Sequence, residues 1–201
     1  VLSFYFLGLI EPLYAQTKEV AEADIEALIK ADNFKEAQYT ISSIPPTKRT
    51  AKWDDLYAKI VVGRVGQLNN QKLCPEGWQE IDRAAADLPK IAKNDAFRVT
   101  ARETATCAAG EYQKDSYSYE NSPKIIERLL SFDSSEDTRY YLATNPTYKW
   151  RAGFLDLIEK NPKKYSGDKN VEKFLMEQIE SGNEEKFENT KKVIAENFFT
   201  A

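Results

Sequence analysis

The chain of 201 residues carries 28 basic and 32 acidic side chains, a net charge of −4 and no histidine. An acidic chain without a basic face is poorly suited to the phosphate backbone, so we expect no nucleic acid among its partners. The absence of histidine excludes Ser-His-Asp and Cys-His catalysis and every histidine-containing metal site. Hydrophobic residues at 42% and charged residues at 30% are typical of a globular protein and not of a disordered one.

An apolar stretch, VLSFYFLGLI, opens the chain and ends at Glu11 and Pro12. A helix needs roughly 20 apolar residues to cross a bilayer, so this stretch predicts no stable membrane span. Its length, and the small residue Ala15 before the polar sequence QTKE, are typical of a secretory signal peptide. We therefore expect a signal peptide over 1–15, a single domain over 16–201, and export to the periplasm or cell envelope. The alternative is a short apolar helix packed on the domain.

Apolar residues then recur at helical spacing along almost the whole chain, and alternating strand patterns of useful length are absent. Turn signals such as Asp32-Asn33 separate the helices, and short connections make successive helices antiparallel neighbours. The sequence therefore predicts an all-α protein built from antiparallel hairpins. About five hairpins are expected, near residues 20–44, 53–93, 95–132, 136–160 and 168–199.

Two helix starts carry recognisable capping signals. Ser122 precedes Pro123, which predicts a cap followed by a proline at the first helical position. Ser135 precedes an acidic pair, Glu136-Asp137, and is the second predicted cap.

Two segments share a pattern of aromatic, small and proline residues. The first is ADNFKEAQYTISSIPP, in which the pattern is formed by Phe34, Ala37, Ile41 and Pro46. The second is GWQEIDRAAADLPK, in which Trp78, Ala85 and Pro89 form a similar pattern. This pattern resembles the turn and second helix of a tetratricopeptide repeat (TPR), although the first helices lack that family's usual Trp and Gly positions. The resemblance implies a TPR-like right-handed solenoid that binds peptides or protein segments in a concave groove without catalysis. The alternative fold is an irregular helical bundle.

The two cysteines, Cys74 and Cys107, lie on either side of a predicted break near Asn94. If the flanking helices fold back on each other about this break, the two thiols come within reach of a disulfide, which an exported chain permits. In the chain-entropy model a bridge closing a loop of this size stabilises by roughly 3–4 kcal/mol, less any strain. The alternative is two unpaired thiols, with Cys107 buried among alanines. A CxxC redox motif is absent, which argues against thiol catalysis.

Aromatic and arginine residues in the second half of the chain form the candidate binding surface. Tyr and Trp combine a flat apolar face with a polar tip, and Arg can bind a carboxylate through two hydrogen bonds. Tyr117 and Tyr119 lie in a polar linker and are expected to be exposed, whereas core packing is the alternative role for Tyr141, Tyr148 and Phe154. The candidate partner-binding residues are Arg139, Tyr140, Tyr141, Tyr148, Trp150, Arg151, Tyr117 and Tyr119.

The sequence contains no recognisable signature of catalysis or cofactor binding. A pair of carboxylates can hydrolyse a glycoside without histidine, but none of the available acidic residues, Glu80 among them, lies in a recognisable signature. Gly63 and Gly66 fall inside a helical stripe and not in a phosphate-binding loop, and calcium loops of the Asp-x-Asp type are missing. We therefore expect no catalytic residue, no metal and no cofactor.

Three classes of function are compatible with these observations. The first is a non-catalytic exported scaffold or adaptor that binds a protein or peptide partner. The second is a binder of cell-wall glycan or peptide through the aromatic surface. The third is a carboxylate-based glycosidase.

Overall fold

The computed structural model describes residues 22–114, 120–150 and 154–180, together with Glu196 and Phe198. Every regular element among these residues is a helix, so the all-α prediction is confirmed. None of the described helices is both long enough and apolar enough to cross a membrane. The predicted signal peptide, residues 1–15, lies outside the described residues.

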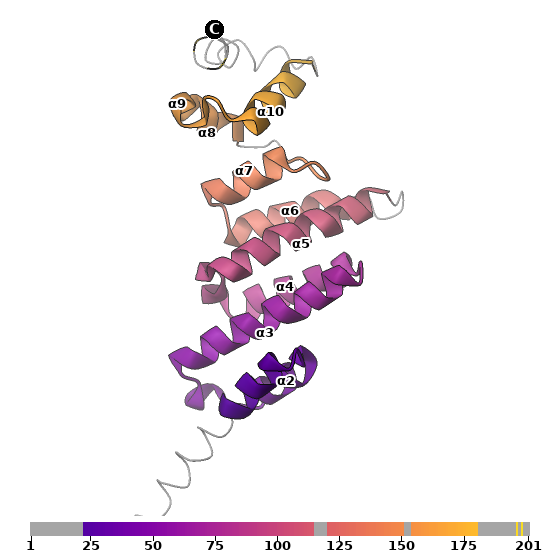
Figure 1. The fold of residues 1–201 in the computed structure, drawn as a ribbon, viewed down its shortest axis with the longest axis vertical. Helices are drawn as coiled ribbons and strands as arrows, with labels where there is room; N and C mark the ends of the chain where they lie inside the picture. The colour runs from indigo at the N-terminus through magenta and orange to yellow at the C-terminus, as the bar shows by residue number, and fades with distance from the viewer. Residues whose placement is uncertain (1–21, 115–119, 151–153, 181–195, 197, 199–201) are drawn as a thin grey trace, which may run out of the picture. The chain divides into compact units, whose positions relative to one another are not determined.

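The chain divides into two compact units, Val1–Thr104 and Ala105–Ala201, and the boundary falls inside one long helix. The first unit contains the helical residues 22–30 and the start of that long helix (Figure 1). Its other elements are α2 (Phe34–Ser42), η1 (Pro46–Lys48), α3 (Ala51–Asn70), α4 (Cys74–Asp87) and η2 (Pro89–Lys93), and the long helix is α5 (Asp95–Lys114).

In the first unit, α2 packs against α3 and α3 packs against α4 (Figure 1). The reversal before α2 is tight because Asp32 adopts a left-handed backbone with a φ of 53°. The reversal before α4 is equally short and places Lys72 at a φ of 61°. Asn and Asp tolerate this conformation better than most residues, so the Asp32-Asn33 stop signal is confirmed on physical grounds.

Helix α3 begins two residues earlier than its apolar stripe, because Thr50 caps it. The Thr50 Oγ1 atom accepts a hydrogen bond from the Trp53 backbone N–H at 3.3 Å. The indole N–H of Trp53 donates to the carbonyl of Ile41 at 3.1 Å, inside the core. Trp53 is thus tied to α2 by a hydrogen bond as well as by apolar burial, which sets how α3 lies against α2.

The second unit contains the later helices (Figure 1). They are α6 (Asn121–Phe132), α7 (Glu136–Thr144), α8 (Phe154–Lys160), α9 (Pro162–Tyr165) and α10 (Lys169–Glu180). Phe154, fully buried, is the centre of their aromatic core. It meets the rings of Tyr140, Tyr165 and Phe174 edge-to-face, with centroids 5.8, 5.6 and 5.4 Å away. This is the geometry that aromatic quadrupoles favour.

The two predicted helix caps have different outcomes. The Ser135 prediction is confirmed, because its Oγ accepts a hydrogen bond from the Thr138 N–H at 3.4 Å. The Ser122 prediction is wrong, because α6 begins at Asn121 and Ser122 is buried within its first turn. Pro123 stands third in the helix, where its missing N–H would have had no intrahelical partner, so the helix can begin ahead of it.

Cys74 and Cys107 are both disulfide-bonded, and the described chain holds no free cysteine. The predicted bridge is therefore confirmed. Cys74 is the buried first residue of α4, and Cys107 lies in the second half of α5.

Candidate functional site

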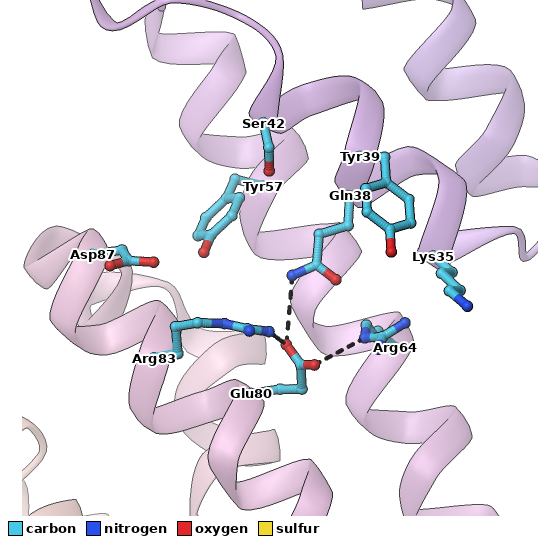
Figure 2. Close-up of a pocket in the computed structure, with 9 residues that line it drawn as sticks. All are labelled: Lys35, Gln38, Tyr39, Ser42, Tyr57, Arg64, Glu80, Arg83 and Asp87. Atoms are coloured by element: carbon cyan, nitrogen blue, oxygen red, sulfur yellow. Dashed lines mark hydrogen bonds and ion pairs between the residues drawn. The ribbon is translucent and has the colours of Figure 1, made fainter.

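A hollow in the first unit has a volume of about 410 Å³ and is formed by α2, α3 and α4. Helix α2 presents four side chains to it from one face, at the i, i+3, i+4, i+7 spacing of a helical stripe. Figure 2 shows the lining residues, which are Lys35, Gln38, Tyr39, Ser42, Tyr57, Arg64, Glu80, Arg83 and Asp87.

A half-buried carboxylate, that of Glu80, links the helices that line the hollow. Arg64 Nε donates to Glu80 Oε1 at 3.2 Å, Gln38 Nε2 lies 3.5 Å from Oε2, and Arg83 forms an ion pair with the same oxygen. These partners come from α2, α3 and α4, so one side chain links all three helices (Figure 2).

The pKa of Glu80 is lowered from its ordinary value of 4.5. Burial alone would raise it, but the hydrogen bonds and positive charges of Arg83 and Arg64 together outweigh the desolvation. Glu80 is therefore ionised at neutral pH and serves as a fixed negative charge.

Two tyrosines give the hollow its apolar surface. Tyr57 is 7% exposed and stacks on Trp53 with ring centroids 5.0 Å apart, while the guanidinium of Arg49 lies 4.2 Å from the Trp53 ring centroid. Burial, and then the charge of Asp87, raises the pKa of Tyr57, so its hydroxyl stays protonated. Tyr39 differs from Tyr57 in being 66% exposed, the highest value among the exposed large hydrophobic residues of the described chain.

Smaller hollows lie elsewhere in the described residues. One, of about 260 Å³, is lined by residues of α3 and of the segment around η2, and an ion pair of 2.5 Å between Lys90 and Asp54 spans it. Another, of about 160 Å³, lies in the second unit, and its Lys149 is paired with Glu177. Both are smaller than the α2–α3–α4 hollow.

The predicted aromatic surface belongs to the second unit, where several of its members take part in packing. Tyr140 donates its hydroxyl hydrogen bond to Asp168 Oδ2 at 2.8 Å and packs on the aromatic core. Tyr148 is 8% exposed, and the half-buried Trp150 donates its backbone N–H to the carbonyl of Leu142 at 2.9 Å. Tyr148 is therefore buried in the packing of the second unit, which was the alternative to a role in binding.

The structure describes only two of the remaining members of that surface. Arg139 and Tyr141 are half-buried on α7, whereas Tyr117, Tyr119 and Arg151 lie outside the described residues. None of the predicted residues lines the hollow on α2, α3 and α4.

From the sequence alone, Glu80 was considered only as an acidic residue outside any catalytic signature. The sequence did not predict that the other lining residues share a site with it. A signal was present on α2, where Lys35, Gln38, Tyr39 and Ser42 share the face opposite the buried Ala37 and Ile41. A large aromatic residue on a polar helix face is the unusual element of that pattern.

Comparisons of the chain with protein-family models, with curated proteins and with solved structures gave no match. Within the ranges that the structure describes, no group of three or more Cys, Asp or Glu side chains could hold a metal ion.

Proposed function

We propose that this protein is a non-catalytic, exported adaptor that binds a segment of a partner protein in the hollow on α2, α3 and α4. The observation that carries the proposal is the highly exposed Tyr39 at the edge of this hollow. Tyrosine is enriched at binding hot spots because a rigid, amphipathic ring gives large contact area at little entropic cost. A volume of about 410 Å³ is also within the usual range for ligand sites, roughly 300–1,000 Å³.

The titration behaviour of the site favours binding over catalysis. A carboxyl group that acts as a general acid in glycoside hydrolysis needs a raised pKa, whereas the pKa of Glu80 is lowered. The pKa of Tyr57 is raised, so its hydroxyl keeps its proton and is a hydrogen-bond donor and not a base. Both groups are suited to recognising a ligand and not to transferring a proton.

The architecture and the disulfide support the wider proposal. Hairpins of helices are compatible with a TPR-like right-handed solenoid, which we propose as the arrangement of the repeats. The disulfide is compatible with the proposed export, because such bonds persist in oxidising compartments and are rare in the cytosol. The predicted surface from Arg139 to Arg151 remains a second candidate contact region for the same partner.

Site-specific photocrosslinking tests the proposal. Benzoylphenylalanine placed at Tyr39 should crosslink one discrete protein from the envelope fraction of the source cells. The matched control is Val99, which is 38% exposed on α5 and does not line the hollow. Equal labelling from both positions, or crosslinking from Tyr141 but not from Tyr39, would contradict a partner site in the hollow. Crosslinking to carbohydrate instead would favour the glycan-binding alternative.

A further inference from the structure

Two charged residues that line the hollow, Lys35 and Asp87, have no ion-pair partner among the described residues. Neither Lys35 nor Asp87 forms an ion pair or a hydrogen bond through its side chain with any residue that the structure describes. Figure 2 shows them at opposite ends of the hollow, with the Glu80 network between them. The single negative charge of Glu80 is paired with two guanidinium groups, those of Arg64 and Arg83, so Glu80 is not free to pair with a charged ligand. The charges open to such a ligand at the two ends are therefore those of Lys35 and Asp87.

The cationic end offers several hydrogen-bond donors. Arg64 uses its Nε on Glu80, and its terminal guanidinium nitrogens bond to no described residue. The hydroxyl of Tyr39 likewise has no hydrogen bond within the described chain. Figure 2 shows Lys35, Tyr39 and Arg64 on the same side of the hollow. An ammonium, a guanidinium edge and a phenol together are well suited to a carboxylate.

The anionic end is formed by Asp87, which is exposed at the C-terminus of a helix. Asp87 is the last residue of α4, where the unsatisfied helix carbonyls already carry partial negative charge. A negative side chain at that position opposes the helix dipole. A cation bound there would relieve both the side-chain charge and the dipole, so a basic group is the ligand that this end favours.

We propose that the occupant of the hollow is an extended peptide segment that carries one acidic and one basic side chain. The acidic side chain pairs with Lys35 and Arg64, and the basic one pairs with Asp87. This inference rests on the proposed function and specifies the chemistry of its partner. A neutral glycan has no charges to match these two ends.

A charge-swap experiment tests the pattern with four blocked octapeptides of one neutral framework. Two positions of the framework are varied, and the four peptides carry there Glu and Lys, Glu and Glu, Lys and Lys, or Gln and Gln. The whole set is made three times, with the two positions separated by two, three or four residues. Binding is followed by fluorescence anisotropy at low salt, because exposed charges are screened. The wild-type protein should bind the Glu/Lys peptide about three- to tenfold more tightly than the Gln/Gln peptide.

Single substitutions should then change the preference in opposite directions. Lys35→Glu places an anion beside Arg64 and neutralises that end, so the preference for the Glu/Lys peptide over the Lys/Lys peptide should be lost. Asp87→Lys leaves two cationic ends and should favour the Glu/Glu peptide. The matched control is Lys59→Glu, since Lys59 is exposed on α3 but does not line the hollow, and it should keep the wild-type ranking. Circular dichroism checks that all variants remain folded.

The outcomes separate this inference from the function on which it rests. An unchanged ranking in Lys35→Glu and Asp87→Lys overturns the charge pattern, as does equal binding of all four peptides by the wild type. Partner crosslinking from Tyr39 in the presence of either result leaves the proposed function standing. Binding of none of the peptides, together with no crosslinking from Tyr39, overturns both.

Discussion

Gly63 and Gly66 lie nearly one helical turn apart in α3, yet the same substitution at each should have opposite effects on stability. A Cβ atom added at Gly63 would overlap the ring carbons of Phe34, because α2 approaches α3 at that point. A Cβ atom added at Gly66 would have no atom within 4 Å. The two positions share a helix interior and differ only in what faces them.

The expected magnitudes follow from helix propensity and from overpacking. Replacing Gly by Ala in a helix interior stabilises by about 0.5–1 kcal/mol, so Gly66→Ala should gain this amount. Gly63→Ala has the same favourable contribution from helix propensity, but its new methyl group must displace the half-buried Phe34 ring. Overpacking of this kind typically costs about 1–3 kcal/mol. The free energy of unfolding should therefore be lower for Gly63→Ala than for Gly66→Ala by roughly 1–3 kcal/mol.

Urea unfolding of both variants measures this difference, and a second background isolates its cause. In Phe34→Ala the obstructing ring is gone, so Gly63→Ala should there become as stabilising as Gly66→Ala. If Gly63→Ala stabilises the protein while Phe34 is present, the proposed close packing of α2 on α3 is refuted.

Three further changes probe the disulfide, the Glu80 network and the second unit. Cys107→Ala should cost roughly 3–4 kcal/mol of unfolding free energy, less any strain relieved, and reductant should no longer change the melting temperature of the variant. Glu80→Gln should cost about 1 kcal/mol at pH 7. Because the folded pKa of Glu80 is lowered from 4.5, its contribution is present above that pH and lost as pH falls, so the variant and wild type should converge in acid unfolding curves. Tyr140→Phe removes the hydrogen bond to Asp168 and should cost about 1–2 kcal/mol in thermal melts, whereas Tyr148→Phe, whose hydroxyl bonds to no described residue, should cost less.

The sequence alone determined the local features of this protein. Helical periodicity, the stop at Asp32-Asn33 and the cap at Ser135 could be predicted because each depends on residues within a few positions of one another. The disulfide was also within reach, because a chain with two cysteines has one possible internal pair. Even at this level the start of α6 was misplaced, since a proline in the first turn is compatible with more than one cap.

Only the tertiary structure decided which polar and aromatic side chains share a site. Glu80 is linked to Gln38 and Arg64, which precede it by 42 and 16 residues, so no local pattern could place them together. The same limit applies to Tyr39 on α2 and Tyr148 in the segment that follows α7, which are 66% and 8% exposed although both are tyrosines. Burial depends on how neighbouring helices pack, and packing is a sum over contacts between residues distant in the chain. The hollow on α2, α3 and α4 therefore exists only once these helices have come together.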